Sequence, residues 1–299
     1  MSFTIAHITD PHLSPAPPPL GADFRLKRFM GYVNWKRGRE GLNDMALLAR
    51  IVADLRAQRP NHIAVTGDLV NIAMPAEFRR AAAWMETFGN PKDVSFVPGN
   101  HDAYVRTALP MLKTTFEPWT AGDSGSSGYP YLRVRGEVAI IGLSSGVPTA
   151  PLMATGRLGR RQIDAFDALL RETGRRGLAR VVLIHHPPLR GESPLRGLTD
   201  AAAFERVVRE RGAEAVLHGH THKQLVRALP SRATRAAGGF VPVLGAPSAA
   251  AAARNPRYRA AYHLVRLDRE GGAWRVSARA RGIMAPGGRA IGEREALAV

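Results

Sequence analysis

Residues 94–102 read Val-Ser-Phe-Val-Pro-Gly-Asn-His-Asp: an apolar run, a Pro-Gly break, then an amide, an imidazole and a carboxylate. The apolar run predicts a short buried strand that Pro98-Gly99 ends. The same order of apolar run and polar cluster recurs at four other places: residues 3–9 before Asp10-Pro11-His12, residues 61–66 before Gly67-Asp68, residues 180–184 before His185-His186, and residues 214–217 before His218-Gly219-His220-Thr221-His222. Helical patterns separate these runs, so the sequence predicts a layered α/β fold.

The polar clusters predict a metal-binding cleft. In layered α/β proteins, ligands bind beyond the carboxyl ends of the strands, so five such ends are expected to converge. Carboxylate, amide oxygen and neutral imidazole suit divalent first-row metals. Their number suits two ions, since one shared carboxylate can hold two metals about 3.5–4 Å apart. The polar side chains at these strand ends are Asp10, His12, Asp68, Asn100, His101, His185, His220 and His222.

These residues also carry a family resemblance. Asp10-x-His12, Gly67-Asp68, Gly99-Asn100-His101-Asp102, His185 in an HHPP turn and Gly219-His220-x-His222 resemble, in order, the five motifs of the calcineurin-like metallophosphoesterases. The resemblance covers roughly residues 3–225 and is greatest to the bacterial cyclic-nucleotide phosphodiesterase-like members. It implies a four-layer α/β/β/α sandwich with two mixed β-sheets.

The resemblance also implies a role for each motif residue. Asp10, His12 and His222 would hold the first metal, Asp68 would bridge, and Asn100, His185 and His220 would hold the second. His101 would protonate the leaving group or stabilise charge on the phosphate, and Asp102 would orient His101. The implied reaction is attack on phosphorus by a metal-bridging hydroxide, with Mn, Fe or Zn as the metal.

The resemblance leaves several substrates open. Phosphodiesters of the cyclic-nucleotide or glycerophosphodiester type are favoured. The alternatives are a lipid-linked or nucleotide-sugar phosphate at a membrane surface, and DNA for an exonuclease. Relatives that cleave a UDP-sugar lipid precursor usually carry Arg where His101 stands, which argues against that substrate. A non-catalytic scaffold is disfavoured because the ligand set is complete.

Composition narrows the class of protein. The chain has no cysteine, which excludes disulfides, zinc-thiolate sites and cysteine nucleophiles. The net charge is +17, but only five of the 42 basic residues are lysine, a bias that GC-rich codon usage produces without any anionic partner. The first residues lack the pattern of a signal peptide, and no run has the ~18 or more apolar residues of a membrane span. We therefore expect a cytoplasmic protein, with peripheral membrane contact as the alternative.

Residues 24–39 form a basic segment with interleaved aromatic side chains. One interpretation is an amphipathic helix beside the cleft with its basic groups solvated. A second is a substrate lid or a contact with an anionic membrane surface. Nucleic-acid binding is the weakest, because no recognised binding module accompanies the segment. Beyond these, the partner we expect is a small phosphorylated substrate, and the late strands could support an oligomer.

Three residues near the motifs remain ambiguous. His218 and Asn71 are candidates for substrate binding, but a packed histidine and a turn or helix cap explain them equally well. His186 follows His185 directly, and adjacent side chains on a turn point to different sides, so we predict only His185 as a ligand.

The chain shows no internal repeat or linker. We expect one domain over residues 1–285, with residues 13–40 as a basic-aromatic insertion near the site, and a loosely ordered tail over 286–299. Helices are predicted over 42–59, 75–88 and 159–173, and another from a cap at Asp200 to Gly212. Loops at 13–40, 103–130 and 144–160 are expected to set specificity.

Overall fold

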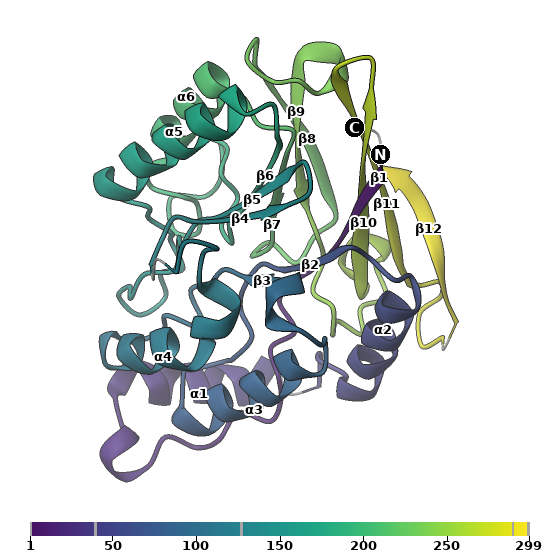
Figure 1. The fold of residues 1–299 in the computed structure, drawn as a ribbon. Helices are drawn as coiled ribbons and strands as arrows, with labels where there is room; N and C mark the ends of the chain where they lie inside the picture. Colours follow the sequence, from purple (N-terminus) through teal and green to yellow (C-terminus); the bar gives the residue numbers. More distant parts are fainter. Residues whose placement is uncertain (1, 39–40, 126–127, 289, 298–299) are drawn as a thin grey trace.

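The structure is a computed structural model that describes residues 2–38, 41–125, 128–288 and 290–297. Two six-stranded mixed sheets lie face to face, and helices flank them on the outside (Figure 1). This arrangement confirms the expected α/β/β/α sandwich.

The first sheet has the order β12-β11-β10-β1-β2-β3. β1 pairs in parallel with β2, and β2 with β3, whereas the other neighbours are antiparallel. Its strands are β1 (Ser2–Ile8), β2 (His62–Val65), β3 (Val94–Phe96), β10 (Ala261–Glu270), β11 (Ala273–Ile283) and β12 (Ile291–Leu297).

The second sheet has the order β4-β5-β6-β7-β9-β8, with a parallel centre from β5 to β9 and an antiparallel strand at each edge. Its strands are β4 (Tyr131–Arg135), β5 (Val138–Gly142), β6 (Ala179–Leu183), β7 (Ala215–His218), β8 (Leu225–Pro230) and β9 (Phe240–Gly245).

Successive side chains along a strand enter two different cores, one between the sheets and one beneath the helices. On β1, Phe3 and Ile5 enter the core between the two sheets, whereas Ala6 and Ile8 enter the core beneath helices. This follows from the period of two, which points successive side chains to opposite faces. The helices over the first sheet are α2 (Met45–Ala57), α3 (Pro75–Glu86) and α4 (Leu109–Thr120), and those over the second are α5 (Arg160–Arg175) and α6 (Ala201–Arg211).

Helix α1 (Leu26–Gly38) is held differently, because polar contacts anchor it to the loop after β2. The buried guanidinium of Arg28 donates hydrogen bonds to the carbonyl oxygens of Ile72 and Ala73. Trp35, two turns further on, is also buried. The short 3-10 turns are η1 (Gly21–Asp23), η2 (Pro91–Asp93), η3 (Arg106–Ala108), η4 (Ala237–Gly239) and η5 (Pro256–Tyr258).

Several expectations from the sequence are wrong. The tail is not loose over residues 291–297, which form edge strand β12 and bury Leu297 against the core. Residues 109–120 are helix α4 and not part of a loop. The side chain of Asp200 does not cap α6, because its carboxylate accepts hydrogen bonds from the amides of Leu158 and Gly159.

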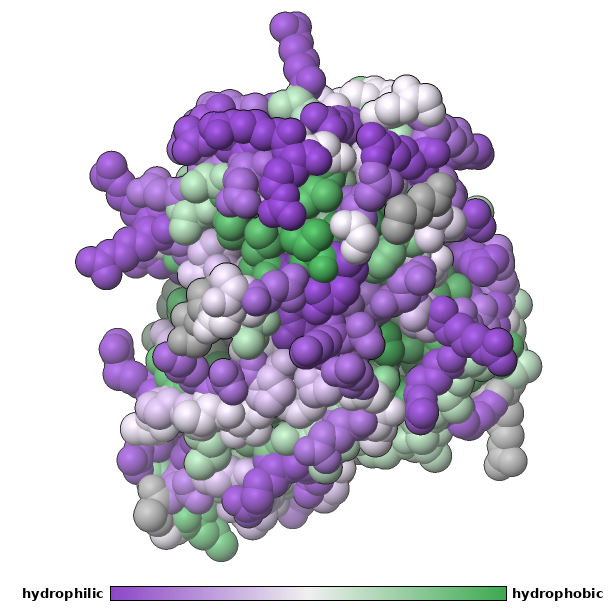
Figure 2. Space-filling model, in the orientation of Figure 1, coloured by the Kyte–Doolittle hydropathy of each residue, from purple (hydrophilic) through white to green (hydrophobic). Residues whose placement is uncertain are grey.

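Polar and apolar side chains are unevenly distributed on the surface. On the face shown in Figure 2, hydrophilic side chains predominate, and hydrophobic ones gather mainly in one area near the upper middle. Among the residues that the structure describes, every helix is too short or too polar to traverse a lipid bilayer.

Candidate metal centre

The loops after β1, β2, β3, β6 and β7 bring the predicted ligands together at one edge of the sandwich. Ligand atoms lie within 4.8 Å of one another in four overlapping groups: Asp10, His12 and His222; Asp10, Asp68 and His185; His12, Asp68 and His101; and His185, His186 and His220. Asn100 lines the same pocket as Asp68 and His220. Strands of both sheets therefore contribute to one centre.

Asp68 lies between two halves of this centre. One half contains Asp10, His12 and His222, and the other contains His185, His186 and His220. The Oδ2 atom of Asp68 is 3.8 Å from His12 Nε2 on one side and 3.3 Å from His185 Nε2 on the other. Its Oδ1 atom accepts a hydrogen bond of 2.8 Å from the backbone amide of His101. One oxygen is thus fixed by the backbone, and the other faces histidines of both halves.

Asp10 organises the other end of the centre. Its Oδ1 atom lies 3.1 Å from His222 Nε2. Its Oδ2 atom accepts hydrogen bonds from the Thr9 hydroxyl, at 2.7 Å, and from the amide of His220, at 3.0 Å. The carboxylate therefore holds the loop after β7 against the loop after β1.

Backbone carbonyls orient two of the histidines. The Nδ1 atom of His185 lies 2.6 Å from the carbonyl oxygen of Thr66, and that of His12 lies 3.2 Å from the carbonyl of Val70. A carbonyl only accepts, so each Nδ1 donates, and each ring therefore directs its Nε2 atom at the centre. This is the usual arrangement of metal-binding histidines in proteins.

Several buried polar atoms in the centre have no hydrogen-bond partner among the residues that the structure describes. They are Asn100 Oδ1 and the Nε2 atoms of His186 and His220, and also Asp10 Oδ1 and His185 Nε2, whose contacts with His222 and Asp68 are ion pairs. Leaving such an atom unsatisfied costs about 1–3 kcal/mol, and more when the atom is charged. Oxygen and imidazole nitrogen donors that converge in this way fit divalent first-row cations.

Electrostatics favour a cation at this point. Burial opposes ionisation of the two aspartates, yet the neighbouring His222 lowers the pKa of Asp10, and His185 lowers that of Asp68. Burial lowers the pKa of His220 to about 3, and the charge of His185 adds to this effect. Burial also lowers the pKa of His185, but the charge of Asp68 outweighs it and raises the value to about 9. Ionised carboxylates thus lie beside the neutral imidazole of His220 and beside His185, whose cationic form the charge of Asp68 favours.

The backbone is strained where the ligands are attached. Positive φ angles, which non-glycine residues rarely adopt, occur at five of the seven candidate ligands: Asp10, His12, Asp68, His220 and His222. Strain of this kind costs about 1–3 kcal/mol per residue and gathers at functional sites. A side chain at Gly99 would collide with the Asp68 carboxylate, and one at Gly219 with Thr9 and Asp10. The motif glycines therefore permit the close approach of the loops.

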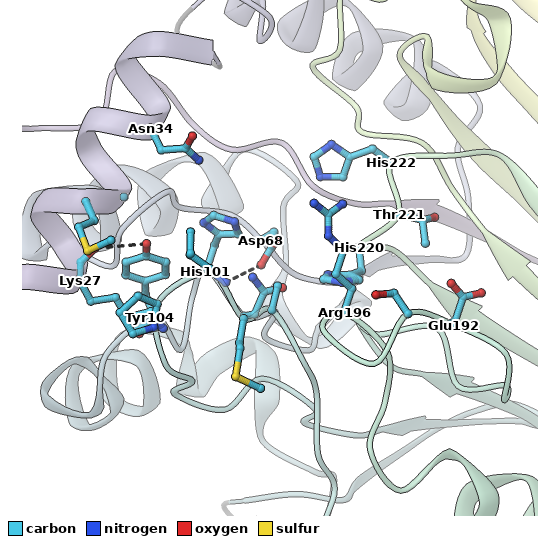
Figure 3. A pocket seen from close by; sticks show the side chains of 18 of the residues that line it. Lys27, Asn34, Asp68, His101, Tyr104, Glu192, Arg196, His220, Thr221 and His222 are labelled. Carbon is cyan, nitrogen blue, oxygen red and sulfur yellow. Dashed lines mark hydrogen bonds between the residues drawn. The ribbon is translucent and has the colours of Figure 1, made fainter.

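Four of the seven candidate ligands, Asp68, Asn100, His220 and His222, line a pocket of about 680 Å³. Figure 3 shows Lys27 and Tyr104 on one side of it, and His222 and Thr221 on the other. Its walls come from α1, from residues 151–154, from residues 192–196 and from Tyr258. The expected specificity loops at 13–40, 103–130 and 144–160 each contribute, whereas residues 192–196 and Tyr258 were not anticipated.

The role expected for Asp102 is wrong. Its buried carboxylate accepts hydrogen bonds from the backbone amides of Asp68, Leu69, Val70 and Gly99, and none of its hydrogen bonds reaches the ring of His101. His101 instead has its Nδ1 atom 2.5 Å from the carbonyl oxygen of Asn71. Asp102 therefore shapes the loops that carry the ligands.

The structure also places the two ambiguous substrate candidates away from the pocket wall. His218 is buried at the end of β7, with Nδ1 3.1 Å from the carbonyl of Gly219. The buried side chain of Asn71 donates to the carbonyl of Leu13. Neither lines the pocket, and Asn71 contributes through its backbone carbonyl to His101.

His186 is the residue that sequence reasoning passed over. Its ring is buried, its Nδ1 atom lies 2.8 Å from the Ser145 hydroxyl, and its ring centroid is 4.5 Å from that of His220. Both histidines of the doublet thus face the centre, although adjacent side chains on a regular strand would not. In the sequence, the adjacent pair His185-His186 was the signal that could have indicated a second histidine at the centre.

Comparison with known proteins agrees with this geometry. Over 279 residues, 92% of this chain and 91% of the relative, the chain is 27% identical to a probable cyclic nucleotide phosphodiesterase of Synechococcus sp.. The fold resembles a dimetal phosphatase of Danio rerio (TM-score 0.62, 14% identity, 94% of this chain and 96% of the other). It also resembles a purple acid phosphatase of yellow lupin (TM-score 0.57, 11% identity, 94% and 52%). A model of the calcineurin-like phosphoesterase family matches residues 3–224, and the chain belongs to that family of phosphoric ester hydrolases.

Proposed function

We propose that this protein hydrolyses small phosphodiesters, of the cyclic-nucleotide or glycerophosphodiester type, with two divalent metal ions. The observation that carries the proposal is the position of Asp68, whose Oδ2 atom faces His12 and His185 from opposite halves of one ligand cluster. The name of the Synechococcus relative supports a diester substrate. A pocket of about 680 Å³ falls within the usual range for sites that bind small molecules.

The proposed ligands fall into two sets around Asp68. Asp10, His12 and His222 would hold one ion, and Asn100, His185 and His220 would hold the other, with His186 as an additional nitrogen beside His220. The ions, when bound, would lower the pKa of water and neutralise charge on the phosphoryl oxygens. The donor set suits Mn, Fe or Zn.

His101 would act on the substrate itself. Its ring lies on the pocket wall, and the contact of 2.5 Å between Nδ1 and the carbonyl oxygen of Asn71 fixes the orientation of the ring. Protonated at Nε2, it can donate to the leaving-group oxygen or to a phosphoryl oxygen. A positioned acid of this kind contributes about 10²–10⁴-fold in rate.

Cations on the pocket wall would bind the anionic substrate. Lys27 lies beside Tyr104, with its Nζ atom 4.4 Å from the ring centre. Arg196 and Lys223 come from two other segments and line the same pocket. A diester with one negative charge would meet positive charge on more than one side, which supports binding of the substrate in one orientation.

The test combines metal analysis with a choice of substrates. Purified protein is analysed for metals and assayed on a bis-aryl phosphodiester and an aryl phosphomonoester, with and without added Mn²⁺. We expect about two transition-metal ions per chain and a higher kcat/KM on the diester. Asp68→Asn serves as the inactive comparison. Absence of bound metal together with absence of hydrolysis under every divalent ion would overturn the proposal, and a preference for the monoester would overturn its substrate class.

A further inference from the structure

Exposed apolar side chains are concentrated on segments that contribute to the pocket wall. More than half of the large apolar side chains that are exposed in the described part of the chain lie on three such segments; Met30, Leu152 and Met153 line the pocket itself, and the others lie close to lining residues in the sequence. We call all of these side chains the apolar rim: Leu20, Phe24, Leu26, Phe29, Met30, Leu152, Met153 and Leu195. Scattered exposed apolar residues are ordinary, but a cluster around one opening marks an interaction surface.

Helix α1 presents the rim by its rotation. Arg28 and Trp35 face the protein interior, and Lys27, Met30 and Asn34 face the pocket. At 100° per residue, Leu26 lies on the solvent side next to the pocket-facing residues, whereas Phe29 lies on the solvent side further round the helix from the pocket. Leu26 is 66% exposed and Phe29 46% exposed. The helix thus turns an apolar stripe to solvent where a helix of this length usually carries charge.

The three segments form one continuous surface. The Nζ atom of Lys27 on α1 donates to the Thr149 hydroxyl at 3.2 Å, which ties the helix to the loop that carries Leu152. The amide of Ala154 in turn donates to the carbonyl of Leu195 at 2.9 Å. Leu152, at the tip of its loop, has a positive φ angle and a 91% exposed side chain. The chain therefore holds an apolar side chain outward at the pocket entrance.

The charges around the rim have one predominant sign. Residues 24–38 contain no acidic residue, and Arg25, Lys36 and Arg37 are exposed beside the apolar stripe. Arg196 and Lys223 add positive charge at the pocket. Besides the candidate ligand Asp68, two acidic residues interrupt this pattern: Glu192, which pairs with Arg227 at 3.7 Å, and Asp23, which pairs with Arg28 at 3.4 Å. Apolar side chains flanked by basic ones match the headgroup region of an anionic bilayer.

We propose that this face docks on an anionic lipid bilayer and that the pocket receives phosphodiesters presented at the bilayer surface. The apolar rim would enter the headgroup boundary, and the basic residues would contact lipid phosphates. A protein partner bound to the apolar rim would block the pocket entrance. A bilayer would instead bring phosphodiester headgroups to that entrance. The substrate part of this inference rests on the proposed function, but docking requires no hydrolysis.

The test measures vesicle binding and hydrolysis separately. Metal-loaded protein is sedimented with vesicles of phosphatidylcholine alone and with vesicles that also contain phosphatidylglycerol. We expect binding to the anionic vesicles, weakened by salt because the attraction is partly electrostatic. Leu26→Ser/Phe29→Ser should lose most of it, since neither residue lines the pocket but both belong to the rim. The matched control Phe240→Ser/Met284→Ser, which removes apolar side chains of similar exposure elsewhere, should bind like wild type.

A second pair of variants isolates charge. Lys36→Glu/Arg37→Glu should reduce binding to anionic vesicles, and Arg171→Glu/Arg175→Glu, with the same change in net charge on α5, should not. Equal sedimentation with neutral and anionic vesicles, no sedimentation, or equal losses in rim and control variants would each overturn the docking proposal.

Hydrolysis separates this inference from the proposed function. Leu26→Ser/Phe29→Ser should retain wild-type kcat/KM on a soluble bis-aryl diester and lose activity on a phospholipid with a nitrophenyl headgroup in anionic vesicles. Vesicle binding without hydrolysis of either diester would contradict the proposed function and leave docking intact. Hydrolysis of the soluble diester without any vesicle binding would contradict docking and leave the proposed function intact.

Discussion

The carboxylate of Asp102 accepts a hydrogen bond of 2.7 Å from the backbone amide of Asp68, a residue 34 positions earlier in the chain. Its second oxygen accepts from the amide of Leu69 at 2.9 Å, and the amide of Gly99 donates to the first at 2.8 Å. One buried side chain thus joins the loop after β2 to the loop after β3. Burial and the charge of Asp68 raise the pKa of Asp102 to about 7.

This relationship predicts that Asp102→Asn loses metal as well as stability. The new amide group would set an N–H against backbone N–H donors, and hydrogen bonds to a charged group contribute about 1.5–3 kcal/mol each. Elemental analysis and urea unfolding measure the two effects. Asp200→Asn is the control, because Asp200 also accepts hydrogen bonds from backbone amides, those of Leu158 and Gly159, neither of which is a candidate ligand; this variant should lose stability alone. Full metal content in Asp102→Asn would contradict the prediction.

His101→Ala separates the acid from the metal ligands. We expect unchanged metal content and a fall in kcat of about 10²–10⁴-fold, since the ring would act on the substrate. The ring lies within reach of His12 and Asp68, so metal analysis decides between the two roles. Loss of an ion in this variant would make His101 a ligand.

His186→Gln should weaken metal binding. Its Nε2 atom is buried without a partner among the described residues, and it belongs to the group that contains His185 and His220. Removal of a residue that binds or orients a metal ligand typically costs 10–100-fold in affinity, which competition with a chelator measures. His218→Gln, also buried but outside every such group, should keep the wild-type affinity. Equal metal affinities in His186→Gln and His218→Gln would mean that, of the adjacent pair, His185 binds metal and His186 does not.

The KM for an anionic diester should rise above pH 8. Burial lowers the pKa of Lys27 from 10.5 to about 8, so its charge in the pocket is lost as the pH rises through that value. Lys27→Gln should show a high KM at neutral pH and no further rise with this midpoint. A wild-type KM that stays flat from pH 7 to the alkaline limit of stability would rule out a charged contact.

The lowered pKa of Lys27 also makes the free energy of unfolding depend on pH. Between pH 8 and 10.5 the unfolded chain keeps a proton on Lys27 that the folded chain has lost. The free energy of unfolding therefore increases as the pH rises through this window, and the Lys27→Gln variant should lack this increase.

A buried ion pair away from the pocket predicts a large loss of stability. Arg180 and Glu214 are 1% and 0% exposed, and their side chains lie 2.8 Å apart. Arg180→Met would leave Glu214 buried without its partner and should cost about 3–5 kcal/mol in urea unfolding. Arg176→Met, which removes an exposed pair with Glu172, should cost at most about 1 kcal/mol. Similar losses in the two variants would contradict the argument.

The sequence by itself determined where the chemistry lies along the chain. Apolar runs such as residues 61–66 and 180–184 predicted buried strands; β2 lies within the first run, and β6 begins and ends one residue before the second. Polar motifs directly after such runs predicted that their side chains would meet, and the structure brings Asp10, Asp68 and His185 within 4.8 Å of one another. This works because alternation of apolar residues and the break after a strand are local properties of the chain. The roles of these residues as ligands remain predictions.

Only the tertiary structure decided the partners of these groups. The sequence of β12 carries little apolar alternation, and the strand forms because the backbone of β11 offers it a hydrogen-bonding edge. Asp102 binds the amides of two loops instead of His101, and His186 turns toward His220, because loop backbones from different strands meet there. The pocket mouth likewise combines α1 with residues 151–154 and 192–196. Such contacts depend on the direction and distance of groups far apart in sequence, which no local pattern encodes.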